Sequence, residues 1–179
     1  MNRAGKFIMW LQIILALVFL SLIENAKANE VDCLVEAIYF ESRSEEFIGQ
    51  LAVANVILER VRSPKFPDTV CTVVHDGQYY KGVPVKHRCA FSYWCDGKKE
   101  IMKDKQALTM AKRVAHMALD GVVLEEVQGA TYYHASYANP KWASQFELAS
   151  RIGKHLFYYD TSYHIFKEEN DSDAQLQMD

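Results

Sequence analysis

A glutamate at the end of an apolar helical stripe is the residue of this sequence best suited to chemistry. Leu34, Ala37 and Ile38 share one face of a predicted helix, and Glu41 lies one or two turns further along it. Burial beside apolar groups disfavours the charged form of a carboxyl, so such a glutamate holds its proton to higher pH than a free one. A general acid needs that property. The structural alternative is a helix-end glutamate that reaches water or pairs with Arg43.

The loop between Cys89 and Cys95 is the second informative stretch. Flat aromatic side chains suit the apolar faces of sugar rings, and this loop carries three of them: Phe91, Tyr93 and Trp94. Ser92 and Asp96 could contact hydroxyl or amide groups beside them. The loop therefore predicts a binding surface for sugars, with Phe91, Ser92 and Tyr93 as its contacts. The alternative is that some of the aromatic rings fill the core beneath the loop.

Four further polar residues are candidates for a cleft. Tyr133 and His134 end a short run of β-type composition, and we expect both to line the cleft, although a hydrogen-bonded structural histidine fits equally well. Gln50 and Asn55 interrupt an otherwise apolar helix. Either could orient Glu41 or a ligand, and we assign Gln50 to the binding site. The more common role of such a residue is that of a satisfied core amide.

Two common functional motifs are absent from the sequence. It contains no phosphate-binding glycine loop and no GxSxG elbow. His75, Asp76 and His87 could be drawn together around a metal, but nothing in their spacing requires one. We therefore predict neither a cofactor nor a metal.

The beginning and the end of the chain have compositions of their own. Arg3 and Lys6 precede an apolar run over residues 7–23, and Ala26-Lys27-Ala28 has the form of a cleavage site. These features predict a signal peptide over residues 1–28 and export to a periplasm or cell envelope, with no stable membrane span after cleavage. An uncleaved anchor is the alternative, since the run is at the short limit for a span. Residues 29–166 are predicted to form one catalytic domain, and the acidic residues 167–179 a disordered tail.

Charge and cysteine content limit the partners and the compartment. The chain has 20 basic and 23 acidic residues, a formal net charge of −3, and its predicted leader is itself basic. A general nucleic-acid footprint is therefore not expected, and any polyanionic partner must be held by local groups. Four cysteines in an exported chain indicate two disulfides, with three possible connectivities. Cys89 and Cys95 are the easiest to close, which leaves Cys33 with Cys71; a zinc site fits the spacing poorly.

Hydrophobic periodicity predicts a mainly helical α+β domain with a small β element. We expect helices over residues 31–41, 46–62, 69–74 and 104–119, and a helix that opens at Pro140 and ends at Gly153. Extended segments are expected over 130–135 and 155–159, and irregular chain over 78–88. Ser42 and Glu45 have the spacing of a capping box, which gives Glu45 a structural role. Glu59 and Arg60 are read as solvated residues near a helix end.

These stretches together resemble the SleB-like cell wall hydrolase family, which includes spore-cortex-lytic enzymes. The resemblance covers most of the chain from Cys33 to Tyr159 and rests on the segments Ile38–Glu45, Gly49–Val61, Phe66–Val70, Cys89–Ser92 and Tyr133–Ala135. The family usually has Ala and Gly where this chain has Ser42 and Ser44. Both departures lie beside Glu41 and leave it in place. The resemblance implies a lysozyme-like fold with a sugar-binding groove, peptidoglycan glycan strands as substrate, and Glu41 as the catalytic acid.

A convincing second acid is missing from the sequence. Glu36 faces away from Glu41 on the predicted helix, Glu45 is assigned to a cap, and Asp96 has no defined place. Most glycosidases use two carboxylates, so a single one favours a lytic transglycosylase that cleaves between N-acetylmuramic acid and N-acetylglucosamine. A muramidase-type hydrolase is the first alternative, and it requires a second carboxylate across the groove.

Three other functions remain open from the sequence. A zinc-dependent amidase would need two or three of four histidines to converge: His75, His87, His134 and His155. A non-catalytic peptidoglycan-binding module would keep the groove without cleavage. A secreted structural or inhibitor protein would not respond to glycans.

Overall fold

The computed structural model describes residue 10, residues 12–15 and residues 29–161. The predicted acidic tail and most of the predicted leader therefore lie outside the described residues. Within the described part of the chain, no helix has the length and apolar character required to cross a membrane.

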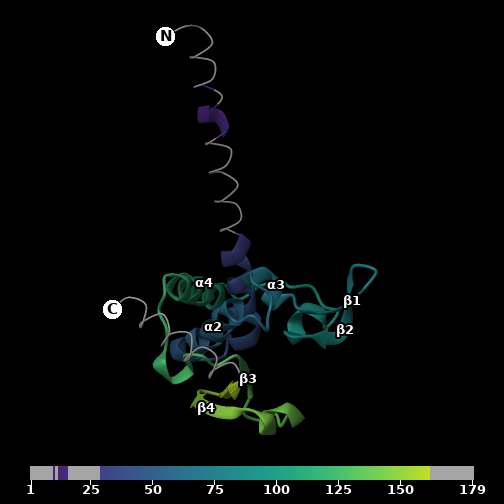
Figure 1. The fold of residues 1–179 in the computed structure, drawn as a ribbon, viewed down its shortest axis with the longest axis vertical. Helices are drawn as coiled ribbons and strands as arrows, with labels where there is room; N and C mark the ends of the chain where they lie inside the picture. The colour runs from purple at the N-terminus through teal and green to yellow at the C-terminus, as the bar shows by residue number, and fades with distance from the viewer. Residues whose placement is uncertain (1–9, 11, 16–28, 162–179) are drawn as a thin grey trace, which may run out of the picture.

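A helical layer built around one buried helix forms the centre of the fold. Helix α2 (Phe47–Arg62) is buried from Gly49 to Arg60. The helix over residues 29–42, the short helix α3 (Val70–Val74) and helix α4 (Lys105–Leu119) pack around it (Figure 1). The predicted helical segments over 31–41, 46–62, 69–74 and 104–119 are all helical in the structure, with ends that differ by one or two residues.

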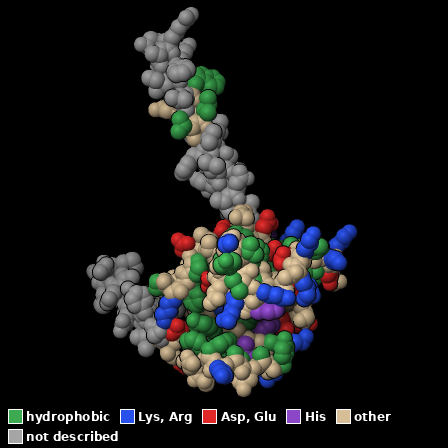
Figure 2. Space-filling model, turned by 90° about the vertical axis from the view of Figure 1, so that its right-hand side faces the viewer, with side chains coloured by type: hydrophobic (Ala, Val, Ile, Leu, Met, Phe, Trp, Pro, Cys, Tyr) green, Lys and Arg blue, Asp and Glu red, His purple; other side chains and the backbone are tan. Residues whose placement is uncertain are grey.

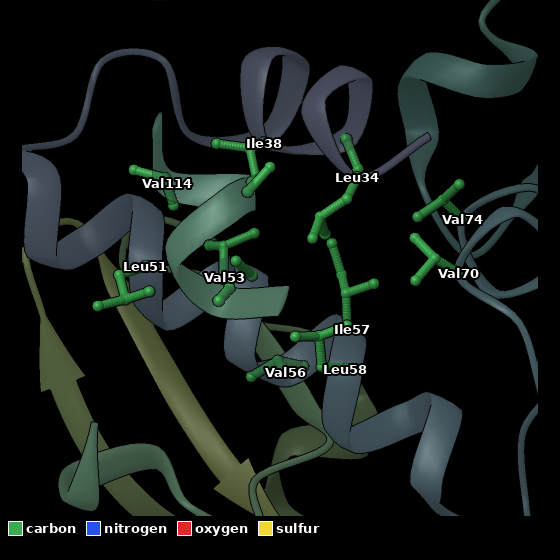
Figure 3. Packing of buried hydrophobic residues seen from close by; sticks show 14 of the residues in the cluster. Leu34, Ile38, Leu51, Val53, Val56, Ile57, Leu58, Val70, Val74 and Val114 are labelled. Carbon is green, nitrogen blue, oxygen red and sulfur yellow. The ribbon is translucent and has the colours of Figure 1, made fainter. Parts of the chain in front are cut away.

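The core lies where apolar faces of these helices meet. Figure 3 shows Leu34 and Ile38 directed toward α2, where Val53 and Ile57 meet them, with Val74 of α3 nearby. All five are at most 1% exposed. Because burying one such side chain contributes roughly 1.5–3 kcal/mol, this packing holds the end of the helix over residues 29–42 in a fixed position.

Helices α3 and α4 each begin at a side-chain cap. The Thr69 hydroxyl accepts a hydrogen bond from the backbone N–H of Thr72, in a capping box that opens α3. The Asp104 carboxylate accepts from the backbone N–H groups of Gln106 and Ala107 and so opens α4. The Asp104 N–H in turn donates to the hydroxyl of Tyr39, which ties α4 to the helix over residues 29–42.

A hairpin replaces the irregular segment expected over residues 78–88. Strands β1 (Gly77–Tyr80) and β2 (Val83–Cys89) pair antiparallel and extend from the helical layer (Figure 1). Lys81 and Gly82, at the turn, both have positive φ, as tight hairpin turns require. Every residue of β1 is exposed, so the strand carries no apolar alternation by which the sequence could have revealed it.

The chain also forms a three-stranded antiparallel sheet, with the strand order β3–β5–β4. Strands β3 (Tyr132–Ala135) and β5 (His155–Tyr159) lie where extended chain was predicted. The helix predicted from Pro140 to Gly153 is wrong: this segment is a 3-10 helix (Lys141–Gln145) followed by strand β4 (Glu147–Ile152). Gly153, with φ +56°, lies in the tight β4–β5 turn instead of ending a helix.

Two disulfides join the elements, with the pairing that the sequence spacing favours. Cys33–Cys71 fastens the helix over residues 29–42 to α3, and Cys89–Cys95 closes the aromatic loop onto the end of β2. The second bridge includes a 3-10 helix (Ser92–Cys95). Another 3-10 helix (Glu125–Val127) precedes β3.

Candidate active site

A cleft of about 510 Å³ lies between the end of the helix over residues 29–42, the loop over residues 90–100, and strands β3 and β5. Its lining includes most of the residues predicted from the sequence: Glu41, Phe91, Ser92, Tyr93, Tyr133 and His134. Segments more than 90 residues apart in the chain therefore meet at one site.

Glu41 is placed at this cleft with Phe40 beside it. Burial raises the pKa of Glu41, whereas a hydrogen bond from Tyr133 and the charge of Arg60 act in the opposite direction and to a smaller extent. The Tyr133 hydroxyl donates to Glu41 Oε2 over 3.1 Å. The site therefore favours a glutamate that stays protonated above its ordinary range and has one fixed oxygen, as a general acid requires.

Tyr133 reaches Glu41 from one face of the small sheet. It pairs with Phe157 in the β3–β5 register, and its ring also makes an edge contact with His155. Burial and the neighbouring Glu41 raise the pKa of Tyr133 well above that of a free phenol. Tyr133 consequently keeps its proton, and can donate it in a hydrogen bond, over the pH range in which Glu41 titrates.

Arg60 is a site residue that the sequence analysis missed. Its reading as a solvated helix end, shared with Glu59, is wrong, since the two residues are 8% and 3% exposed. The Arg60 Nε–H donates to the Thr131 carbonyl over 2.7 Å, and the guanidinium lies 5.2–5.7 Å from three ring centres: Phe66, Phe91 and Tyr132. Arg60 also lines the cleft, so a buried cation faces the site of Glu41.

The aromatic side chains of the loop over residues 90–100 face two places, the cleft and the β1–β2 hairpin. Tyr93 stacks on Phe40 with ring centres 5.0 Å apart, and Phe91 is 1% exposed, so it fills the core beneath the cleft. Trp94 turns away: it stacks on His75 at 3.6 Å and donates from Nε1 to the hydroxyl of Tyr79. The loop therefore offers Tyr93 and Ser92 to the cleft, and Trp94 to the hairpin.

Both core amides take the structural role. Gln50 is 3% exposed, donates to the Glu45 carbonyl, and does not line the cleft, which does not support the binding role assigned to it. Asn55 donates to the Val122 carbonyl and accepts from the Leu124 N–H. Both side chains are thus held by backbone groups, and the hydrogen bond to Glu41 comes from Tyr133 instead.

His134 lines the cleft with both ring nitrogens engaged. Nε2 lies 2.9 Å from the Tyr158 hydroxyl, and Nδ1 lies 2.9 Å from the carbonyl of Ala135. The ring stacks on Tyr158 and contacts the edge of Trp142. His134 is thus a structural histidine that borders the cleft.

Three other acids near the site differ in their partners and in whether they line the cleft. Asp96 accepts two hydrogen bonds from Lys98, which lower its pKa, and Glu100 also lines the cleft. Glu36 is outside the lining, 4.0 Å from His75 Nε2, and burial together with Glu100 raises its pKa. Among these, Asp96 and Glu100 are placed to approach a ligand from the side of the aromatic loop.

The predicted capping box at Ser42 and Glu45 is wrong. The Ser42 hydroxyl donates back to the Ile38 carbonyl, and α2 begins after Glu46 without a side-chain cap. The Glu45 carboxylate instead accepts from the backbone N–H of Lys154, at the β4–β5 turn. A contact across 109 residues has no local signal in the sequence.

The histidines and acids of the described residues include no group of three or more that could hold a metal ion. His134 and His155 line the cleft, whereas His75 stacks on Trp94 at a separate pocket beside β1. His87 lies in β2. Two of the four histidines that a zinc-dependent amidase could use therefore meet at the cleft, without the third ligand that would complete such a group among the described residues.

Basic side chains line the cleft beside three acids, Glu41, Asp96 and Glu100, although the chain as a whole is acidic. Arg43, Lys98 and Lys99 line it together with Arg60. Figure 2 views the molecule from the side of the β1–β2 hairpin, and it shows lysine and arginine side chains gathered on this face with histidines near its middle. Local cations of this kind can hold an anionic polymer despite the overall charge.

A helix-rich fold with a small sheet and an aromatic cleft, in which burial raises the pKa of a glutamate carboxyl, fits an enzyme that protonates a leaving group. Residues 44–158 match the model of the cell wall hydrolase family. The chain belongs to this family. The match begins just after Glu41, so the role of Glu41 rests on the geometry above.

Curated relatives and solved structures agree with this family. The chain is 35% identical to a spore cortex-lytic enzyme of Halalkalibacterium halodurans over 72% of this chain and 34% of that protein, and 32% identical to one of Bacillus cereus over 72% and 44%. The chain thus spans less than half the length of these relatives. Its fold is similar to the catalytic domain of the germination-specific lytic transglycosylase SleB from Bacillus anthracis (TM-score 0.57, 32% identity, 73% of this chain and 93% of that one). It is also similar to the catalytic domain of Bacillus cereus SleB (TM-score 0.55, 31% identity, 73% and 90%).

Proposed function

We propose that the chain cleaves peptidoglycan glycan strands between N-acetylmuramic acid and N-acetylglucosamine as a lytic transglycosylase, with Glu41 as its acid and base. The observation that carries the proposal is the partly buried Glu41 carboxyl in an aromatic cleft, where burial raises its pKa and Tyr133 fixes one of its oxygens. Membership of the cell wall hydrolase family and the similarity to a lytic transglycosylase domain support it.

In the first step, protonated Glu41 donates its proton to the glycosidic oxygen as the bond from that oxygen to C1 of the muramic sugar breaks. Positive charge develops on the sugar ring, and the acetamido oxygen of the same sugar can stabilise it. The Glu41 carboxylate left behind keeps the hydrogen bond from Tyr133 and the nearby charge of Arg60. Both favour its ionised form, so the loss of the proton is eased at the moment of bond cleavage.

In the second step, the Glu41 carboxylate takes the proton of the C6 hydroxyl of the same sugar, and O6 forms a bond to C1. The product is a 1,6-anhydromuramic end, no water is consumed, and Glu41 is protonated again for the next cycle. One residue therefore serves as acid and then as base, which a single carboxyl with a raised pKa can do.

Plain hydrolysis is the second candidate, and Glu100 is the observation that favours it. Glu100 lines the same cleft as Glu41, and no hydrogen bond to its side chain is found in the described residues. Asp96 is less suited to activate water because Lys98 holds its carboxylate from two directions. A hydrolase would leave a reducing muramic end instead of an anhydro end.

Mass analysis of soluble fragments from purified peptidoglycan tests both candidates. We expect anhydro ends from the wild-type protein and none from Glu41→Gln, while Glu100→Gln still yields anhydro ends. Reducing ends that disappear in Glu100→Gln would establish hydrolysis. Absence of any cleavage by the wild-type protein would leave a non-catalytic binding module as the better account.

The proposal also includes the compartment in which the protein acts and the limits of its domain. A signal peptide over residues 1–28 would export a catalytic domain over residues 29–166 to the periplasm or cell envelope, where its substrate lies. Two disulfides in the structure fit an oxidising compartment. Ser92, Tyr93, Tyr133 and His134 would then form the walls of the glycan-binding cleft, with Phe91 packed beneath them.

A further inference from the structure

We propose that Glu45 fixes the ring of His155 so that His155 Nε2 accepts a hydrogen bond from the glycan in the cleft. The donor on the substrate would be an N–H or O–H group, such as the N–H of an N-acetyl substituent. This inference rests on the proposed function for its ligand, and on the contacts of Glu45 and His155 for its geometry.

Glu45 is a buried carboxylate that connects the segment before α2 to the β4–β5 turn. Its side chain is 4% exposed, and its Oε2 accepts a 3.0 Å hydrogen bond from the Lys154 N–H at the β4–β5 turn. Oε1 lies 3.8 Å from Nδ1 of His155. One carboxylate oxygen therefore holds the turn, and the other faces the histidine that follows it.

Two glycines leave the space that the Glu45 side chain occupies. A Cβ added to Gly49 would lie 2.9 Å from the Glu45 Cβ, and one added to Gly153 would overlap Glu45 Oε2. Gly153 also has φ +56°, which side chains rarely adopt. The placement of Glu45 against the turn is thus built into the backbone on both sides of the carboxylate.

His155 presents its two ring nitrogens to different surroundings. Nδ1 is buried and has no hydrogen-bond partner at the distances found here, so the Glu45 carboxylate is its nearest charged neighbour. The ring also lines the cleft, which leaves Nε2 as the nitrogen available to a ligand. Burial lowers the pKa of His155 and Glu45 acts against this, so the ring is neutral at mildly alkaline pH.

A carboxylate beside Nδ1 favours the tautomer that carries the proton there, because Nδ1–H can then point at a negative charge. Nε2 is left as an acceptor toward the cleft. The same ring makes an edge contact with Tyr133, whose hydroxyl donates to Glu41. A ligand group bound at His155 Nε2 would therefore lie next to the catalytic carboxyl.

Glu45→Gln separates this role from a purely structural one. The Gln amide oxygen can still accept from the Lys154 N–H, so the β4–β5 turn is retained. Its NH₂ group, in place of Oε1, then faces Nδ1 with N–H groups, so the ring proton should move to Nε2, which changes from an acceptor to a donor. Glu46→Gln is the matched control, because Glu46 is exposed and its side chain caps nothing.

The experiment measures the His155 tautomer by ¹⁵N NMR of the ring at pH 8, with His155→Gln to assign the signal. We expect Nδ1–H in the wild type and in Glu46→Gln, and Nε2–H in Glu45→Gln. In cleavage assays on peptidoglycan, Glu45→Gln should raise KM about tenfold with a smaller change in kcat, as expected for one lost hydrogen bond to substrate.

A wild-type ring protonated at Nε2, or a Glu45→Gln protein with the wild-type tautomer and KM, would overturn the inference. These outcomes are distinguishable from a failure of the proposed function. If the wild-type protein cleaves no peptidoglycan, the proposed reaction fails and the substrate contact at His155 fails with it. The NMR signal then still decides whether Glu45 orients His155.

Discussion

The hydroxyl of Tyr133 donates a 3.1 Å hydrogen bond to Oε2 of Glu41, and this bond joins the small sheet to the end of the helix over residues 29–42. It leaves Oε1 as the oxygen that can carry a transferable proton. It also stabilises the ionised carboxylate and so limits the rise in the pKa of Glu41 that burial causes. The balance between burial and this bond sets the pH range in which Glu41 can act as an acid.

Replacement of Glu41 by Gln should abolish catalysis and preserve the fold. Gln has nearly the same shape and can accept the Tyr133 hydrogen bond, but it has no proton to transfer. General acid–base catalysis contributes about 10²–10⁴-fold, so the cleavage rate should fall by at least that factor. Fragment release from peptidoglycan measures the rate, and circular dichroism checks the fold. Wild-type rates in Glu41→Gln would rule out Glu41 as the acid.

Tyr133→Phe should shift the pH profile of cleavage toward higher pH. The bond from Tyr133 favours the charged form of Glu41, so its removal raises the pKa of Glu41 further. Activity that needs protonated Glu41 is lost as pH rises through that pKa. The alkaline limb of the kcat/KM profile should therefore move to higher pH. Tyr80→Phe, in the exposed hairpin, is the control and should leave the profile unchanged. An unmoved or lowered limb in Tyr133→Phe would contradict this account of the site.

The same pKa shift predicts that Glu41 lowers stability at neutral pH. A carboxyl whose pKa is higher in the folded than in the unfolded state binds more protons when folded, so the free energy of unfolding falls as pH rises between the two values. Gln cannot ionise and avoids this loss. Glu41→Gln should therefore be more stable than the wild type at pH 7, and the difference should shrink below about pH 4. Urea unfolding at the two pH values measures it, and an equal or larger gain at low pH would contradict the burial of Glu41.

Arg60→Leu should lower the free energy of unfolding and raise the pKa of Glu41. The substitution leaves the Thr131 carbonyl without its buried donor, a loss of roughly 1–3 kcal/mol in the free energy of unfolding. It also removes a positive charge that lowers the pKa of Glu41, so the alkaline limb should move upward as in Tyr133→Phe. Arg88→Leu is a control, because Arg88 is exposed on β2 and does not line the cleft. Equal destabilisation by both variants would argue against a special role for Arg60.

The helices were predictable because each carries its own apolar period, and β3 and β5 because their β-type residues are concentrated in short runs. The β1–β2 hairpin was not, since β1 buries no side chain and so lacks alternation. The segment over residues 141–152 has apolar residues at helical spacing, but Phe146 stacks on Tyr132 at 4.2 Å, and β4 pairs with β5. Tertiary pairing overrides local periodicity there.

Within the site, sequence patterns found the groups that lie near their apolar neighbours in the chain. Glu41 and the aromatic loop have such local patterns. Arg60 and Glu45 do not, because their partners Thr131 and Lys154 lie 71 and 109 residues away. The Arg60 side chain could have been suspected only from its place on a helix that is apolar on nearly every side.

The disulfide between Cys33 and Cys71 should stabilise the fold without being needed to position Glu41. It fastens the helix over residues 29–42, which carries Glu41, to α3 across 38 residues of sequence. A Cys33→Ala/Cys71→Ala double variant should lose about 2–4 kcal/mol in the free energy of unfolding, measured with urea. Because Leu34 and Ile38 still pack on α2 near Glu41, we expect cleavage activity to persist at temperatures at which the variant remains folded. Loss of activity in a fully folded double variant would show that the disulfide, more than the apolar packing, positions Glu41.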